Sequence, residues 1–401
     1  MKILHINSLG YEAGGVETSI LALKKVHIEN VQEVRILSSN ISNGSKLFSD
    51  YTFKYPNSNI FLKIFLKLFN PFSYFKLRGI LLEFQPDIVH IHRMDYLSPS
   101  ILMLLKKYPT IMTIHSPEEF IKSTLVWFMP HTYFRDADNI SISNLNLMGK
   151  FHYFFHTVIQ KRLYDRGLKN IDQFITPSKY FTNLIKAEIY PVSTLHNGVE
   201  LGKFKSKKEL NYSILYAGRL DKFKGIDYLI SAMPKIIESI PNARLTLIGE
   251  GIYREELMKL INKLGLNKNI FIKKWMEKDN LFKAYSNADL FIIPSIWPES
   301  FGKTGLEAMS TGTPVIGTNV GGIPEWLIHG VNGYLVEPKN SDQLAEAIIK
   351  LFKDPDLLKK MRLNARKQAE HFSLKTNMDS YIKLYTNIIN KYNSNKNTIL
   401  P

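Results

Sequence analysis

The sequence of 401 residues contains no cysteine. The chain therefore has no disulfide, no thiolate metal site and no cysteine nucleophile, and this absence fits a reducing compartment. Runs of 18 apolar residues are also missing, so we expect no membrane-spanning segment. Met1-Lys2 leads directly into the short run Ile3–Ile6, which predicts no export signal. We expect a cytoplasmic location, with the inner face of the cytoplasmic membrane as an alternative.

Acidic residues are scarce compared with basic ones. The 36 Asp and Glu residues face 52 Lys and Arg residues, which gives a formal net charge of +16. Such a balance favours an anionic partner, such as a phosphorylated substrate or an anionic membrane. A general lysine bias in the source would explain the excess equally well. We find no basic and aromatic recognition module and therefore expect no nucleic-acid partner.

Residues 60–78 are unusually aromatic and basic. Lys63 and Lys67 lie four residues apart within the apolar run Ile60–Phe75, so a helix would carry them on one face. This pattern is typical of a helix that lies in a membrane interface. A half-buried core helix whose lysines reach solvent gives the same pattern. Both interpretations remain open at the level of sequence.

The rest of the chain alternates strand-like and helix-like segments, and 45% of its residues are hydrophobic, enough for large cores. This alternation predicts parallel sheets with crossover helices. The pattern restarts after Asn197-Gly198, so we expect domains at 1–198 and 199–375. Strands are expected at 2–8, 33–38, 86–92, 110–115, 174–177, 212–217, 243–248, 270–273, 289–294 and 314–317. Helices are expected at 16–27, 226–240, 255–264, 304–311, 344–353, 355–371 and 376–392, followed by a frayed polar end at 393–401.

Two glutamates flank a predicted helix start in the second half. Glu299 lies in a loop after a strand, the helix is expected to begin near Gly302, and Glu307 follows eight residues after Glu299. At the helical rise they would be about 10–12 Å apart, roughly the span from a sugar ring across a diphosphate to a ribose. The helix N-terminus between them suits an anion. An ordinary helix start is the alternative, and we favour the ligand site for the string as a whole.

Two cations follow an earlier strand of the same half. Arg219 and Lys224 lie in a loop between Gly218 and Gly225. Arg219 by its fork and Lys224 as a point charge would neutralise a diphosphate leaving group. In isolation a solvated basic turn is the commoner outcome, and the downstream glutamates favour the functional interpretation.

The first half offers weaker signals. Gly14-Gly15 follows the opening strand and would let the backbone approach a phosphate or a sugar, but it lacks the spacing of the dinucleotide fingerprint. His115 ends a predicted strand, where it would bond a sugar hydroxyl or handle a proton.

Two groups resemble metal sites. Asp136 and Asp138 have the spacing of an acidic pair, and His152 and His156 are four residues apart. Neither group has a suitable second cluster of ligands in the sequence, so we interpret them as turn and packing residues and expect no metal.

These motifs resemble the retaining glycosyltransferases of family 4, which include many bacterial polysaccharide and lipopolysaccharide enzymes. The resemblance covers nearly the whole chain and is most specific in the second half. It implies the GT-B fold, an α/β architecture of two Rossmann-like domains that face each other across a cleft, with the last helix returning to the first domain. Its motifs are Gly14-Gly15, Asn197-Gly198-Val199, Gly218-Arg219, Lys224-Gly225, Gly249-Glu250-Gly251, Glu299 to Glu307, Gly312-Thr313-Pro314-Val315, Gly321-Gly322-Ile323-Pro324-Glu325 and Asn332-Gly333.

The resemblance also implies roles for single residues. Arg219 and Lys224 would hold the donor diphosphate, and Glu307 would bind the ribose. His115 would contact the donor sugar, and Glu299 would bind the same sugar. The remaining donor-binding residues would be Gly14, Gly15, Gly249, Glu250, Trp275, Met276, Phe301, Gly302, Lys303 and Thr304, with Gly249 to Met276 near the base. This sequence departs from the family at Trp275, where a glycine is common, and at Lys303-Thr304, where aliphatic residues are usual.

The implied activity is metal-independent transfer of a hexosyl-type sugar, with retention, from a UDP- or GDP-sugar. The acceptor would be a glycan or a lipid-linked sugar in the synthesis of capsule, O-antigen or exopolysaccharide. No cofactor beyond the donor is expected. Another GT-B enzyme, such as an epimerase or a phosphorylase, and a non-catalytic sugar-nucleotide binder are the alternatives.

Overall fold

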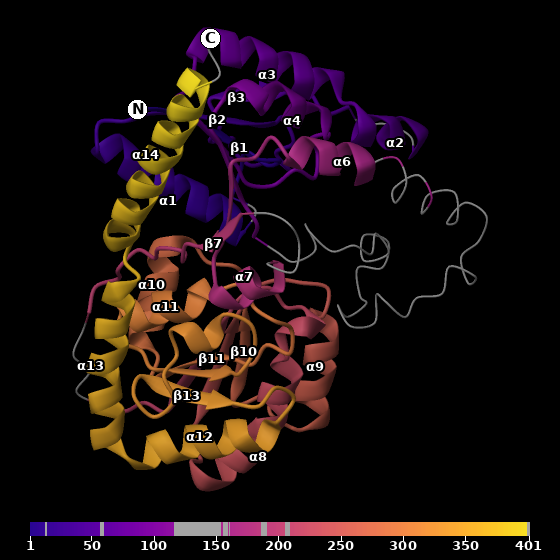
Figure 1. Ribbon diagram of the computed structural model, residues 1–401. Helices are drawn as coiled ribbons and strands as arrows, with labels where there is room; N and C mark the ends of the chain where they lie inside the picture. The colour runs from indigo at the N-terminus through magenta and orange to yellow at the C-terminus, as the bar shows by residue number, and fades with distance from the viewer. Residues whose placement is uncertain are drawn as a thin grey trace. The chain divides into compact units, whose positions relative to one another are not determined.

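The computed structural model describes residues 1–12, 14–56, 60–115, 154, 159, 161–185, 191–204 and 209–398 (Figure 1). The chain divides into two compact units. The first unit comprises Met1–Pro177, Thr182–Leu195 and Met378–Pro401, and the second comprises Ser178–Phe181 and His196–Asn377. The residues Asp136, Asp138, His152 and His156 lie outside the described part of the chain.

The first unit is built on a seven-stranded sheet of order β3-β2-β1-β4-β5-β6-β7. Every neighbouring pair is parallel, as the alternation of strands and helices predicts. Chain order reverses between the neighbours β1 and β4. From β1 the sheet continues through β2 to β3 at one edge, and from β4 it continues through β5 and β6 to β7 at the other. The strands are β1 (Lys2–Ile6), β2 (Glu33–Ser39), β3 (Tyr51–Phe53), β4 (Ile88–Ile91), β5 (Thr110–Thr113), β6 (Gln173–Thr176) and β7 (Val192–Thr194).

Helices cover both faces of this sheet. One face packs against α1 (Gly15–Glu29) and the part of α14 (Leu374–Thr398) that begins at Met378, through buried Leu23, Tyr381 and Tyr385. The other face packs against α3 (Pro71–Phe84) and α4 (Ser100–Leu104). The remaining elements are α2 (Ile60–Leu68), η1 (Leu105–Lys107), α6 (Lys161–Leu168) and α7 (Lys179–Ile185).

The aromatic and basic segment forms two helices rather than one. Helix α2 ends at Leu68, and Asn70 caps α3, because its side chain accepts a hydrogen bond of 3.2 Å from the backbone N–H of Ser73. Pro71 occupies the first turn of α3, where its missing N–H costs nothing. No helix among the described residues has the length and apolar character needed to cross a membrane.

The second unit contains a six-stranded sheet of order β10-β9-β8-β11-β12-β13, again with parallel pairs. One face packs on α8, α9 and α12, and the other on α10, α11 and α13. The strands are β8 (Ser213–Ala217), β9 (Arg244–Ile248), β10 (Ile270–Lys273), β11 (Leu290–Ile293), β12 (Val315–Thr318) and β13 (Gly333–Val336). The helices are η7 (Lys222–Lys224), α8 (Ile226–Ser239), α9 (Arg254–Lys263), α10 (Lys278–Asn287), α11 (Lys303–Ser310), η8 (Ile323–Glu325), α12 (Ser341–Lys353) and α13 (Pro355–His371).

The predicted fold class is confirmed: two α/β units with parallel sheets, and a last helix whose larger part belongs to the first unit. The prediction was wrong about the end of that helix. Residues 393–398 continue α14, where we expected fraying. The run Asn393–Thr398 is polar, but helical pairing of backbone groups does not require apolar side chains at an exposed end.

Candidate active site

The carboxyl ends of the parallel strands in the second unit bring four loops to one edge of the sheet. Chain order reverses between the neighbours β8 and β11, because β9 and β10 extend the sheet on one side and β12 and β13 on the other. Ligands of open α/β sheets bind at such a reversal. The loop after β8 carries Arg219 and Lys224, and the loop after β11 carries Glu299. The topology therefore explains why residues 75 positions apart meet.

Lys224 and Glu299 form an ion pair at this reversal. The Nζ of Lys224 lies 2.6 Å from Oε1 of Glu299, and the hydroxyl of Ser295 donates to the same oxygen. Burial alone would raise the pKa of Glu299, but the ammonium of Lys224 and the two hydrogen bonds outweigh it, so the pKa is lowered. The site thus presents a cation and an ionised carboxylate side by side.

Glycines allow these loops to approach one another. Gly225 has φ 62°, and a Cβ there would lie 2.1 Å from the carbonyl oxygen of Pro294, at the end of β11. Gly249 has φ 151°, and its Cβ would lie 1.9 Å from the carbonyl oxygen of Gly218. Any larger residue at either position would force the loops apart.

Arg219 lies beside the pair but is open to solvent. Its side chain is 75% exposed, and its guanidinium lies 3.2 Å from the carboxylate of Asp221. The backbone carbonyl of Arg219 accepts a hydrogen bond of 2.7 Å from the hydroxyl of buried Tyr216, which fixes the turn. The guanidinium is therefore accessible to an anion at low cost in desolvation.

Helix α11 begins at Lys303, next to Gly302, near which the helix start was predicted. Gly302 is the N-cap, with φ 74°, and no side chain caps the helix. The preceding Phe301 is buried, and its carbonyl accepts a hydrogen bond of 2.5 Å from the indole N–H of Trp326. This contact anchors the start of the helix, whose N–H groups and positive dipole end favour an anion.

Glu307 faces a different environment from Glu299. The hydroxyl of buried Tyr285 donates to Oε2 of Glu307 over 3.3 Å. Burial raises the pKa of Glu307, although the charges of Lys303 and Lys278 oppose this change. Burial also disfavours the charged form of Lys303, and therefore lowers its pKa. Two carboxylates on either side of one helix start therefore differ in their tendency to ionise.

The other predicted residues of this unit lie at the ends of β9 and β10. Gly249 and Glu250 follow β9, and Trp275 and Met276 follow β10. Trp275 is 57% exposed, whereas Met276 packs against the core under α11. Thr304 lies in the first turn of α11. The part these residues play in binding a base stays a prediction.

The first unit carries the remaining predicted residues. Gly14 is the N-cap of α1, and a Cβ on Gly15 would meet nothing within 4 Å. His115 follows β5, and its Nε2 lies 3.1 Å from Nδ1 of His92. A side chain at position 15 would therefore meet no steric obstacle within the described part of the protein.

Sequence reasoning missed several residues around the predicted ones. Ser295, Tyr285 and Lys278 surround the two glutamates, and His92 contacts His115. Ser295 lies two residues after the end of β11, so its place near a strand end was a usable signal. Tyr285 and Lys278 come from α10, which the sequence pattern did not predict.

Comparison with known proteins identifies the chain at two levels. The model described as Glycosyl transferases group 1 matches residues 200–368, and the model described as Glycosyltransferase Family 4 matches residues 13–203. The fold is that of the GT-B glycosyltransferases. Within this class, the chain belongs to the family 4 type, as its motifs predict.

Curated relatives match part of the chain. An uncharacterized glycosyltransferase of Methanocaldococcus jannaschii is 42% identical over 38% of this chain and 39% of its own length. A D-inositol 3-phosphate glycosyltransferase of Segniliparus rotundus is 29% identical over 51% of this chain and 49% of its own length. The chain therefore spans about half the length, or less, of these relatives.

Solved structures match nearly the whole chain. Sucrose-phosphate synthase from Thermosynechococcus elongatus has a TM-score of 0.75 and 20% identity, covering 98% of this chain and 100% of its own. Anabaena HepE, solved in complex with UDP and glucose, has a TM-score of 0.69 and 18% identity, covering 96% of this chain and 100% of its own. At these identities the likeness establishes the fold.

Proposed function

We propose that the protein is a retaining glycosyltransferase that moves a hexosyl-type sugar from a UDP- or GDP-sugar to a glycan or lipid-linked acceptor in surface polysaccharide synthesis. The observation that carries this proposal is the Lys224–Glu299 pair, 2.6 Å long, at the point where chain order reverses in the second sheet. The complex of HepE with UDP and glucose supports a nucleotide-sugar donor in a protein of the same fold.

In this proposal each group of the site binds one part of the donor. The ammonium of Lys224 and the guanidinium of Arg219 bind the diphosphate and stabilise the charge that develops as the anomeric C–O bond breaks. The ionised carboxylate of Glu299 accepts hydrogen bonds from hydroxyls of the transferred sugar. Glu307 accepts hydrogen bonds from the ribose, and His115 contacts the sugar.

Retention follows if the acceptor oxygen attacks from the side on which the phosphate leaves. In that step the new C–O bond forms on the same face, the bond to the β-phosphate oxygen breaks, and the leaving phosphate takes the acceptor's proton. The two cations and the helix dipole supply the stabilisation that a metal ion supplies elsewhere. We therefore propose metal independence and no cofactor beyond the donor.

Calorimetric titration with UDP-, GDP-, ADP- and dTDP-sugars, with magnesium and with EDTA, tests the donor site. One nucleotide sugar should bind equally well under both conditions, and Lys224→Ala should weaken it about 100-fold through loss of a charge-assisted contact. Lys222→Ala is the matched control, since Lys222 is exposed in the same turn. Equal losses in the two variants would mean that general charge, rather than the pair, binds the donor.

Product analysis separates an enzyme from a binder. Hydrolysis or transfer of the bound donor, lost in Arg219→Ala, would identify an enzyme. NMR of the product should show the anomeric configuration of the donor. Binding without turnover for every acceptor tried would favour the non-catalytic sugar-nucleotide binder, and inversion would contradict the retaining assignment.

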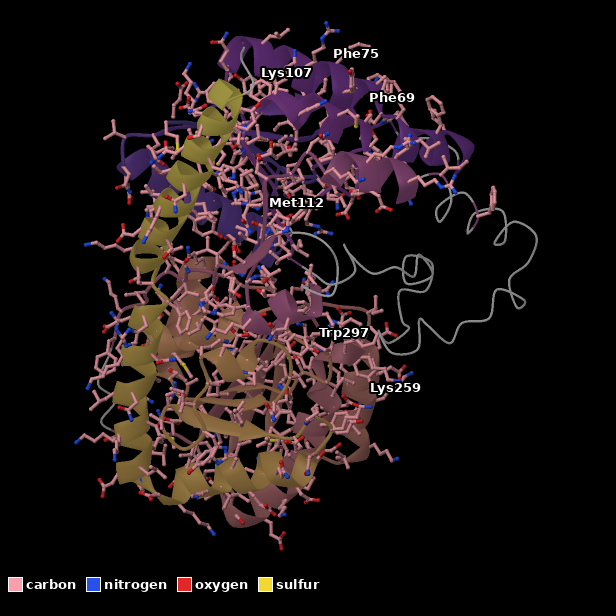
Figure 2. The ribbon with its side chains drawn as sticks, in the orientation of Figure 1. Phe69, Phe75, Lys107, Met112, Lys259 and Trp297 are labelled. Atoms are coloured by element: carbon pink, nitrogen blue, oxygen red, sulfur yellow. The ribbon has the colours of Figure 1, made fainter. Side chains whose placement is uncertain are left out.

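We also propose that the first unit contacts an anionic membrane through α3. Phe72, Phe75 and Leu82 are exposed on this helix, and Phe75 is 60% exposed. Figure 2 labels Phe75 on α3. Their spacing of three and seven residues places them in one stripe, with exposed Arg78 beside it. An apolar stripe flanked by cations is the pattern of interfacial binding. Such contact would bring the enzyme to a lipid-linked acceptor.

Sedimentation with phosphatidylglycerol vesicles tests this contact. The double variant Phe72→Ser/Phe75→Ser should bind at least about tenfold more weakly, because two aromatic side chains no longer leave water. Ile252→Ser, at an exposed apolar residue of the second unit, is the control. Unchanged binding of the double variant would overturn the proposal.

A further inference from the structure

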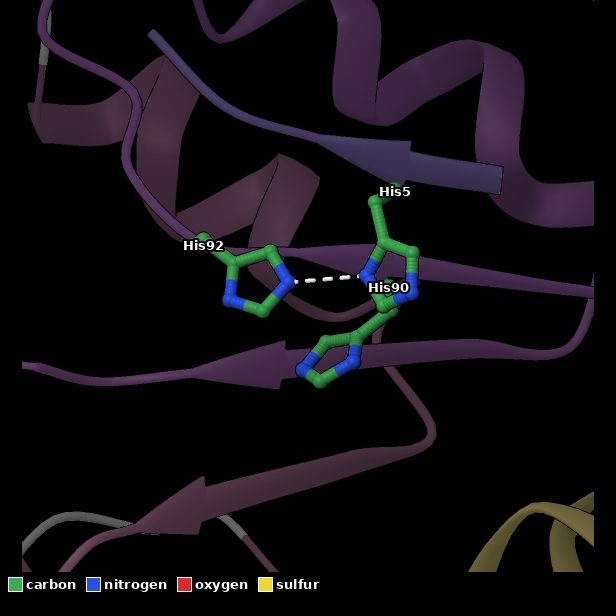
Figure 3. A group of neighbouring side chains, drawn as sticks. All are labelled: His5, His90 and His92. Atoms are coloured by element: carbon green, nitrogen blue, oxygen red, sulfur yellow. Dashed lines mark hydrogen bonds between the residues drawn. The ribbon is translucent and has the colours of Figure 1, made fainter. Parts of the chain in front are cut away.

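A line of hydrogen-bonded histidines leads from the interior of the first unit to His115. The Nδ1 of His5 lies 2.9 Å from Nε2 of His92, and Nδ1 of His92 lies 3.1 Å from Nε2 of His115. Figure 3 shows the first of these contacts, with His90 beside it. His5 and His92 are buried, and His115 is partly exposed. The three residues, His5, His92 and His115, are called the histidine chain below.

The histidine chain follows from strand register at the reversal of the first sheet. His5 on β1 pairs with His90 on β4, and His90 in turn pairs with Ile111 on β5. Because alternate side chains share one face of a sheet, His92 lies on the same side as His90, and His115 on the same side as Ile111. The histidine chain therefore crosses from β1 through the end of β4 to the end of β5.

His90 belongs to a separate pair of contacts. Its Nδ1 lies 2.6 Å from the hydroxyl of Tyr385, and its Nε2 lies 2.6 Å from the hydroxyl of Thr113. His5, His90 and His92 could by their proximity hold a metal ion. Binding one would require breaking a bond of His90 and the contact between His5 and His92, so the observed contacts favour hydrogen bonding over metal binding.

The positions of the protons in the histidine chain follow from one buried atom. Nε2 of His5 is buried and has no hydrogen-bond partner among the described residues. A buried N–H without an acceptor is rarer and costlier than a buried lone pair without a donor. His5 therefore carries its proton on Nδ1 and donates to His92. His92 then carries its proton on Nδ1 and donates to Nε2 of His115, which leaves the proton of His115 on Nδ1.

Burial keeps the rings of His5 and His92 neutral. Burial lowers the pKa of His5 and of His92 well below the usual value, and the neighbouring histidines lower the pKa of His92 further. His5 and His92 then each carry one proton, as the assignment above requires.

We propose that His92 is a positioning residue that fixes the ring orientation and the tautomer of His115, so that His115 presents an N–H at Nδ1. This inference rests on the proposed function, in which His115 contacts the transferred sugar. A neutral ring with a fixed N–H donates a hydrogen bond to a sugar oxygen without having to reorganise during transfer. In this arrangement His115 acts as a hydrogen-bond donor.

Nitrogen-15 NMR of histidine-labelled protein tests the tautomer without any donor. At neutral pH, His115 should show a protonated Nδ1 and an unprotonated Nε2. In His92→Phe, the His115 signals should move toward the averaged values of a ring that exchanges tautomers. His90→Phe is the matched control, because it is equally buried but lies outside the chain, and it should leave the His115 signals unchanged. An Nε2-protonated His115, or no change in His92→Phe, would overturn the proposal.

Kinetics then test whether His92 acts through His115. His92→Phe should lower kcat about tenfold or more while the donor KM changes much less, and His92→Gln should restore part of the rate because an amide can both donate and accept. In a His115→Phe background, His92→Phe should cause no further loss. Additive losses, or a stoichiometric metal bound by the native protein and lost in His92→Phe, would contradict the proposal. A fixed tautomer with unchanged transfer in His115→Phe would instead contradict the proposed role of His115 in catalysis.

Discussion

Single residues of the second unit show that burial and charge set opposite trends in two neighbouring carboxylates. The pKa of Glu299 is lowered by Lys224 in spite of burial, whereas the pKa of Glu307 is raised by burial. A carboxylate with a lowered pKa stabilises the fold above its usual value of 4.5, and this contribution is lost as pH falls through the lowered value. A raised pKa has the opposite effect on the stability of the fold, so ionised Glu307 costs stability at neutral pH.

Replacement of the two glutamates should therefore affect stability in opposite directions. Glu299→Gln should lower the free energy of unfolding by about 1–3 kcal/mol, because it leaves the Lys224 ammonium without its anionic partner. Glu307→Gln should raise it, by up to about 1 kcal/mol, while weakening the donor through loss of an acceptor for the ribose. Thermal unfolding and donor titration of both variants measure these effects. A loss of stability in Glu307→Gln would show that its contacts outweigh its burial.

The buried histidines predict a loss of stability in mild acid. Burial lowers the pKa of His27 from 6.5 to about 4. A base whose pKa is lowered in the folded state stabilises the fold above 6.5, and this stability is lost as pH falls from 6.5 toward 4 because the unfolded chain takes up the proton first. The difference corresponds to about 3 kcal/mol for His27 alone.

Unfolding measured between pH 7 and pH 4 should show this slope, and His27→Gln should reduce it. His329→Gln is the control, because His329 is exposed in the second unit. An unchanged slope in His27→Gln would mean that His27 is protonated in the folded protein.

At the scale of elements, helix α11 depends on close packing against Trp326. A Cβ on Gly305 would lie 2.3 Å from the indole of Trp326 and 2.7 Å from Ile293. A Cβ on Gly79, in α3, would meet nothing within 4 Å. Both glycines lie inside helices, so intrinsic propensity alone favours alanine at each by about 1 kcal/mol.

Gly305→Ala should therefore destabilise the protein by about 1–3 kcal/mol, because the overpacked indole must move. Gly79→Ala should stabilise it by up to about 1 kcal/mol. Calorimetric unfolding of the two variants measures the difference. Stabilisation by both substitutions would show that α11 can shift away from Trp326 at little cost.

The sequence predicted elements where one signal dominates. Runs rich in isoleucine and leucine marked β8, β9 and β11, and the strand end at Pro294 placed Glu299 in a loop. The strands β3, β7 and β13 were missed. Strands β3 and β7 have only three residues each, too few for a detectable alternation. Helix α10 was missed for a related reason: in Lys278–Asn287 only Tyr285 is buried, so its apolar face is weak.

The candidate site was predictable as a set of loops but not as a set of contacts. Parallel strands imply that the loops after β8 and β11 share an edge, but the order of strands in the sheet is set by distant packing. The pairing of Lys224 with Glu299 could not be read from the sequence for this reason. The contact between His92 and His115 could not be read from the sequence either, because the sequence does not place their strands side by side.

At the scale of the whole molecule, the last helix completes the core of the first unit. Met378, Tyr381, Tyr385 and Ile388 are buried against strands β1, β4, β5 and β6. Burial of each such side chain contributes about 1.5–3 kcal/mol, so together they match a large part of a domain's net stability.

A chain that ends at Asn377 should therefore lose the cooperative unfolding of its first unit and keep that of the second. Differential scanning calorimetry and limited proteolysis measure both. A chain that ends at Tyr392 is the control, because it retains all four buried side chains. Two intact transitions in the shorter chain would show that the first unit folds without the last helix.

This arrangement of α14 has a consequence for synthesis on the ribosome. His90 on β4 emerges early, yet the hydroxyl of Tyr385 that bonds it emerges 295 residues later. All of the second unit, Ser178–Phe181 and His196–Asn377, lies in this interval. The nascent protein therefore completes its second half before its first, and the part of the polypeptide made earliest waits longest for its native environment.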